Sequence, residues 1–152
     1  MEIEQKDGVW RVTGDITESM DVSHIKIVDG SKTVFDLSGV RTINSCGVRE
    51  WLAWINKRNI RPIYQNCSQA VVMQFNMVSE FLDHGAQVAS FQIPAYCSNC
   101  DEHKIFTLFS GKDFHPGKAV NFEFPPCKTP DCHIDPDVDL EIYCYFVEEL
   151  KE

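Results

Sequence analysis

The chain is poor in basic residues and has no long apolar run. Of its 152 residues only 14 are Lys or Arg, against 23 Asp or Glu, so the formal net charge is −9. Binding to nucleic acid needs clustered Lys and Arg, which displace counterions from the phosphates, and an anionic membrane surface makes a similar demand. No apolar run, including the one at residues 70–73, approaches the about 18 residues of a membrane-spanning helix. The composition therefore argues against nucleic acid and membrane as partners.

The beginning of the chain lacks the apolar stretch of a secretory signal peptide. Charged residues interrupt it instead, namely Glu2, Glu4, Lys6 and Asp7. We therefore expect a cytoplasmic protein. The chain has seven cysteines, and in such a reducing compartment those that occur in close pairs are expected to bind metal rather than to form disulfides.

Two close cysteine pairs are the most informative motif. They are separated by 26 residues and consist of Cys97, Cys100, Cys127 and Cys132. Close pairs of this kind are typical of zinc sites, and four thiolates complete the tetrahedron that Zn²⁺ prefers. Because no coordination position stays open, the predicted zinc is structural. Two alternatives stay open: a redox Cys-x-x-C motif, and a site in which His103 or His133 replaces one cysteine.

The first ninety-odd residues alternate strand and helix patterns. Strands are predicted at residues 9–12, 32–37, 60–64 and 88–93, with Ser38-Gly39 after the second and Pro94 ending the last. Apolar residues at helical spacing predict one helix from Gly47 and another from Ser68 to about Phe81. This order indicates an α/β domain over residues 1–93 with a mixed, partly parallel sheet.

Beyond Cys100 the pattern changes to short alternating strands. Residues 105–109, 120–124 and 140–146 predict three of them. Together with the two cysteine pairs they indicate a small all-β zinc ribbon over residues 94–152.

The segment 33–48 resembles the core signature of the STAS domain, the family of bacterial anti-sigma-factor antagonists. Residues 36–40, Asp-Leu-Ser-Gly-Val, match the end of the family's strand, and the helix-opening motif corresponds to Asn44, Ser45, Cys46, Gly47 and Val48. The resemblance covers roughly residues 8–93. It implies a non-catalytic regulatory module in bacterial signalling, with residues 44–48 forming the switch surface. The implied partner is a kinase-like anti-sigma factor or a sensor scaffold.

The chain departs from the family pattern at two of these positions. Cys46 stands where the family has its phosphorylated serine, and Asn44 stands where it has an acidic residue. Cysteine is no substrate for a serine kinase, so the resemblance implies a permanently binding-competent or a divergent form. Ser45 remains a candidate for phosphorylation or for capping the following helix.

We do not expect an enzyme, because the sequence contains no recognisable general base, nucleophile pair, phosphate loop or open metal site. One alternative function is a zinc-ribbon protein that acts on nucleic acid as a transcription accessory factor. Another is a thiol redox sensor at Cys46, because a helix N-terminus lowers a thiol pKa, although the pattern favours an inert small residue there. Cys67 and Cys144 have no assigned role.

Overall fold

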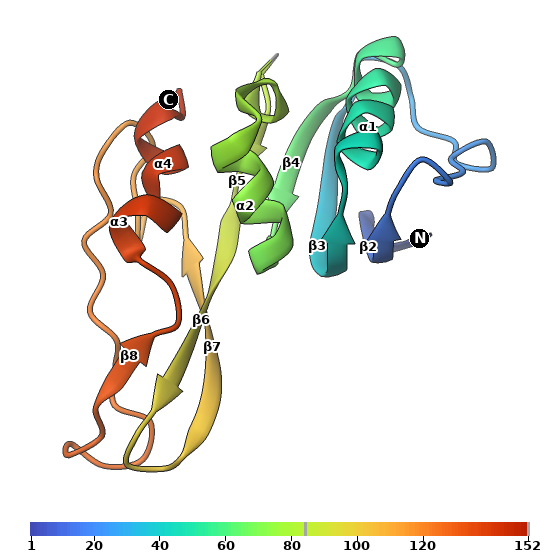
Figure 1. Cartoon of the computed structure of the whole chain (residues 1–152). Coiled ribbons are helices and arrows are strands. Elements are labelled where there is room, and N and C mark those ends of the chain that lie inside the picture. The colour runs from blue at the N-terminus through green and yellow to red at the C-terminus, as the bar shows by residue number, and fades with distance from the viewer. Residues whose placement is uncertain (84, 152) are drawn as a thin grey trace.

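A five-stranded mixed sheet forms the first half of the protein (Figure 1). The computed structural model describes residues 1–83 and 85–151. The strand order is β1-β2-β3-β4-β5; β1 and β2 are antiparallel and the other neighbours are parallel. The bounds are β1 Glu2–Lys6, β2 Val9–Ile16, β3 Lys32–Ile43, β4 Arg61–Gln65 and β5 Gln87–Val88. The predicted mixed α/β architecture is confirmed.

Strand β3 continues past the predicted stop at Ser38-Gly39. The pairing of β2 with β3 shifts register between Arg11 and Thr13, where the partner moves from Asp36 to Gly39. A Cβ atom on Gly39 would lie 2.6 Å from Cγ2 of Thr13. The glycine therefore allows a bulge with close strand approach, and it does not end the strand.

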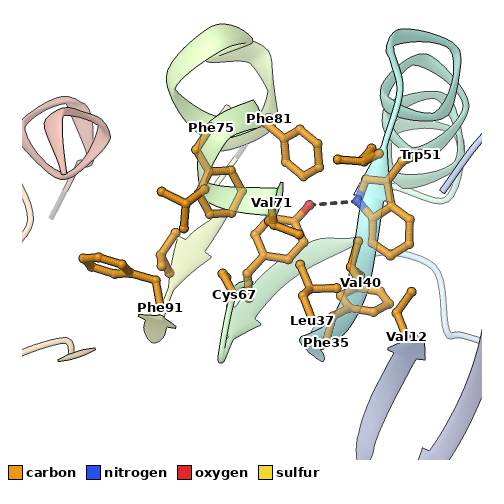
Figure 2. Packing of buried hydrophobic residues seen from close by; sticks show 14 of the residues in the cluster. Val12, Phe35, Leu37, Val40, Trp51, Cys67, Val71, Phe75, Phe81 and Phe91 are labelled. Atoms are coloured by element: carbon orange, nitrogen blue, oxygen red, sulfur yellow. Dashed lines mark hydrogen bonds between the residues drawn. The ribbon is translucent and has the colours of Figure 1, made fainter. Parts of the chain in front are cut away.

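Helices α1 (Ser45–Lys57) and α2 (Gln69–Met77), the latter followed by the short 3-10 helix η1 (Ser79–Leu82), cover one face of this sheet. Trp51 of α1 and Phe75 of α2, both labelled in Figure 2, contact the buried ring of Tyr64 on β4. The Tyr64 ring centre lies 5.8 Å from that of Phe75 and 5.7 Å from that of Phe81. From the other side, Trp51 Nε1 donates a hydrogen bond of 3.1 Å to Tyr64 Oη.

Replacing Tyr64 by Phe should destabilise the fold without creating a cavity. Trp51 and Tyr64 are both fully buried, so the indole N–H would lose its partner where water cannot replace it. A buried unpaired donor costs about 1–3 kcal/mol. Urea unfolding of Tyr64→Phe should show this loss, whereas Tyr145→Phe on the surface should stay within about 0.5 kcal/mol of the parent. Equal stability of the two variants would contradict the expectation.

A second, three-stranded sheet extends away from the first (Figure 1). Its order is β7-β6-β8, all antiparallel, with bounds β6 Ser90–Cys97, β7 Glu102–Phe109 and β8 Ile134–Pro136. Only Ala89 separates β5 from β6. Backbone hydrogen bonds tie the base of β6 to the first half, from Cys67 N to Ser90 O and from Gln92 N to Cys67 O.

The expected stop at Pro94 is wrong, because β6 runs through it to Cys97. The carbonyl of Pro94 accepts a bond of 2.9 Å from Asp137 N. In an extended strand the N and O of one residue point to the same side, so the missing N–H of Pro94 faces the end of β8. The pairing of β6 with β7 is left intact. The predicted boundary between residues 93 and 94 thus falls inside a strand.

The predicted strand at residues 140–146 is also wrong. The chain forms helices α3 (Leu140–Tyr143) and α4 (Tyr145–Glu149), and Asp139 caps α3 by accepting from the backbone N–H groups of Glu141 and Ile142. Residues 118–126, which include the predicted strand 120–124, form no assigned strand. Of the three predicted strands only the one at 105–109 exists, as part of β7, so this region is not all-β.

The two halves share one apolar core. Phe91 of β6 contacts Phe114 and Phe146, each with ring centres 5.1 Å apart, and Phe146 in turn lies 5.3 Å from Phe75 of α2. Helices α3 and α4 therefore cover the base of β6 and pack beside α2 (Figure 1).

Candidate metal centre and the start of helix α1

Two loops at the far end of the second sheet bring the four predicted cysteines together. Cys97 ends β6 and Cys100 lies in the β6–β7 turn, whereas Cys127 and Cys132 precede β8. The β6–β8 pairing places Ile134 opposite Cys97, so the second cysteine pair arrives beside the first. All four Sγ atoms lie within 4.8 Å of one another.

The spacing of the sulfur atoms fits a tetrahedral metal ion. Sγ of Cys127 lies 3.2 Å from that of Cys100, 3.3 Å from that of Cys97 and 3.2 Å from that of Cys132, and Cys100 and Cys132 are 3.7 Å apart. Zinc–sulfur bonds of about 2.3 Å in a tetrahedron place the sulfurs about 3.8 Å apart. Small outward movements of the thiols would therefore accommodate the ion.

Neighbouring polar groups stabilise negative sulfur at this centre. The backbone N–H of Cys100 donates to Cys97 Sγ at 3.4 Å, and Asn99 Nδ2 lies 3.7 Å from Cys132 Sγ. Backbone hydrogen bonds from Thr129 and Lys128 lower the pKa of Cys132 to about 5, whereas contact with the neighbouring thiols raises the pKa of Cys100 to about 12 and also raises that of Cys127. Metal binding requires thiolates, and these contacts are the supporting groups that commonly surround a metal's ligands.

Neither histidine belongs to the cluster. His103 Nδ1 lies 3.7 Å from Asp137, His133 Nε2 lies 3.0 Å from Asp135, and both histidine side chains are mostly exposed. Within the described residues the four cysteines are the only group found with metal-ligand spacing. Their donor set is soft and closed, which suits zinc in a structural role.

The switch surface implied by the STAS resemblance lies at the start of α1. Asn44, not Ser45, caps this helix: its Oδ1 accepts from Gly47 N at 2.7 Å, so the capping interpretation of Ser45 is wrong. The backbone N–H of Asn44 donates to Ile16 O at 3.2 Å, and its Nδ2 donates to Glu18 at 3.1 Å. Asn44 and Ser45 are exposed, Cys46 is half-buried, and Gly47 and Val48 are buried.

The acidic residue of the Asp-Leu-Ser-Gly-Val segment has a structural role that the sequence did not reveal. Burial alone would raise the pKa of Asp36, but hydrogen bonds from Ser38 N and Oγ and from Asn66 Nδ2 outweigh it and lower the pKa. Ser90 Oγ in turn contacts Asn66. Asp36 thus fixes the end of β4 against β3 and the base of β6.

Cys67 and Cys144, which lie outside the four-cysteine cluster, are buried thiols. Burial raises the pKa of Cys67 well above its ordinary value and that of Cys144 to about 12. Such thiols stay protonated and unreactive at neutral pH. Among the seven cysteines, only Cys46 is both outside the cluster and partly accessible.

Searches against family models, characterised proteins and solved structures find no match for this chain. Across residues 1–83 and 85–151 no helix has the length and apolar character needed to cross a membrane.

Proposed function

We propose that this protein is a non-catalytic regulatory module that binds a partner protein through residues 44–48, in the manner of an anti-sigma-factor antagonist, and that a structural zinc ion holds its C-terminal sheet. The resemblance of residues 33–48 to the STAS signature supports the family assignment. The proposal includes a kinase-like anti-sigma factor or a sensor scaffold as partner and a cytoplasmic, bacterial setting.

The observation that carries the proposal is an exposed helix start whose backbone is held by hydrogen bonds. Asn44 and Ser45 present polar groups to solvent, while the backbone beneath them is bonded to Ile16 and packed against it at Gly47. Preorganised surfaces lose little conformational entropy when a partner binds. The motif that resembles the STAS switch therefore coincides with a surface suited to recognition.

Charges near the metal centre favour a protein partner over nucleic acid. The two lysines closest to the cysteines, Lys104 and Lys128, both pair with Glu102, at 2.8 and 3.3 Å. Paired lysines are poorly placed to neutralise phosphates, and the net charge of −9 opposes approach to a polyanion. The cysteine centre is accordingly assigned a structural role.

The test is affinity capture from extract of the native cell, comparing the parent chain with Ser45→Asp. An aspartate in the first turn of α1 interacts favourably with the helix dipole, so folding should be preserved while the surface gains a charge. We expect a specific partner to be lost with Ser45→Asp and retained with Ser98→Asp, a matched serine at the metal end of the molecule. A partner profile identical for all three baits would refute binding through residues 44–48. RNA polymerase or nucleic-acid-dependent partners would transfer the function to the metal-bearing sheet.

A further inference from the structure

Exposed apolar side chains gather where α2 meets the C-terminal helices. Of the seven large apolar residues that are exposed in the described part of the chain, four lie here: Met73 and Met77 on α2, Ile142 on α3 and Tyr145 on α4. Met77 and Ile142 are 73% and 69% exposed. Clustering of this kind marks interaction sites.

The cluster borders a groove. A hollow of about 320 Å³ lies between α2 and α3, lined mainly by Met73, Met77, Val138 and Ile142. Two further hollows, one beside Ile142 and Tyr145 and one between α2 and α4, share Asn76 with the first. We call these three neighbouring hollows together the α2–α3 groove.

Hydrogen bonds hold the walls of the groove at a fixed separation. Asn76 Nδ2 donates to Tyr143 O, and Asn76 Oδ1 accepts from Phe146 N, both at 2.8 Å. The Tyr143 hydroxyl donates to Gln92 O at 2.6 Å and anchors α3 to β6. The groove is therefore formed before any partner arrives, while its methionine side chains can adapt to what enters.

The charges around the groove select its occupant. Four acidic residues line it, Asp83, Asp139, Glu141 and Glu149, against one basic residue, Lys151. A second copy of this chain would bring the same acidic rim and a net charge of −9. An anionic membrane would be repelled as well. A cationic partner with an apolar stripe is complementary in both shape and charge.

We propose that the α2–α3 groove binds an amphipathic helix of a partner protein whose flanks carry Lys and Arg. Apolar side chains on one face of that helix enter the hollow between Met73, Met77 and Ile142, and its basic flanks face the acidic rim. This inference goes beyond the proposed function and is independent of it, since none of residues 44–48 lines the groove.

The four methionines allow a direct test by NMR of methyl-¹³C-methionine protein. Met73 and Met77 lie in the groove, and Met1 and Met20 are internal controls. The probes are three designed peptides of about 18 residues, long enough for an apolar stripe: a Leu stripe flanked by Lys, the same stripe flanked by Glu, and a scrambled Lys peptide. We expect the first to shift the Met73 and Met77 signals, the second to bind at least about tenfold more weakly, and the third to leave them unchanged.

Substitutions locate the binding. Met77→Glu should weaken the Lys peptide at least about tenfold, whereas Val28→Glu, at another exposed apolar residue, should leave binding unchanged; both sites are exposed, so folding is preserved. Equal binding of the scrambled peptide would refute the proposal. Met73 and Met77 shifts caused by protein concentration alone would assign the groove to a second copy, and shifts caused by phosphatidylglycerol vesicles would assign it to a membrane; either would overturn it. Ser45→Asp should not change the peptide affinity, so this test and the partner-capture test fail separately.

Discussion

Removing the metal from the four-cysteine centre should lower the unfolding free energy by about 3 kcal/mol. This is the effect of a cross-link that closes a loop as long as the segment between Cys100 and Cys127. For a chain of this size the unfolding temperature should fall by about 10 °C. The outer end of the second sheet has little else to hold it. Strand β8 has three residues, and in the described part of residues 98–139 only Leu108 and Phe114 are buried apolar residues.

The measurement combines metal analysis with calorimetry. The purified protein should contain one zinc ion per chain, and Cys100→Ser should lose it together with the stability. The matched control is Cys46→Ser, a partly accessible thiol outside the cluster, which should keep both. A stable protein that retains full unfolding temperature after chelation would contradict a structural metal. A Cys46→Ser variant without zinc would show that the ligand set is different.

Replacing Gly47 by Ala should destabilise the protein by about 3 kcal/mol, at the upper end of the effect of overpacking. Helix propensity alone predicts the opposite sign, since Ala is favoured over Gly by about 1 kcal/mol inside a helix. The contacts around Gly47 decide between destabilisation by overpacking and stabilisation by helix propensity. A Cβ atom at residue 47 would lie 2.1 Å from Ile16 O and 2.9 Å from Thr17 N, and these are backbone atoms that cannot rotate away.

Urea unfolding of Gly47→Ala, compared with that of Ser45→Ala, separates the effect of overpacking from that of helix propensity. Ser45 lies in the same helical turn and is exposed, so its alanine variant should change stability by no more than about 0.5 kcal/mol. A stabilised Gly47→Ala variant would mean that α1 and the segment after β2 are further apart than described. If only the Gly47→Ala variant is destabilised, the close approach of the Ile16 backbone explains why a glycine follows Cys46.

The sequence predicted those features that depend on local spacing. The cysteine pairs and the apolar faces of α1 and α2 recur at intervals that one segment determines by itself. The C-terminal helices did not follow from such a pattern, because Leu140, Ile142, Cys144 and Phe146 alternate like a strand. The residues buried there are Tyr143, Cys144, Phe146, Val147 and Leu150, a helical spacing that competes with the alternation.

Long-range contacts account for the other differences. The choice of Asn44 over Ser45 as the cap of α1 depends on where β3 ends and on the bond from Asn44 N to Ile16 O. The α2–α3 groove joins residues about seventy positions apart, which meet because α3 is anchored to β6. Neither relation leaves a signal in the local order of residues.

Strand β6 limits how this protein could have been assembled or divided during evolution. Its first residues, Phe91 and Ile93, lie in the core, and its last residue is the first cysteine of the metal centre. A gene fragment that transferred the cysteines to another protein would have to carry β6 as well, and with it α3 and α4, which cover its base. We therefore expect the sheet that carries the four cysteines to be inherited together with the first sheet as one unit and not as an exchangeable module.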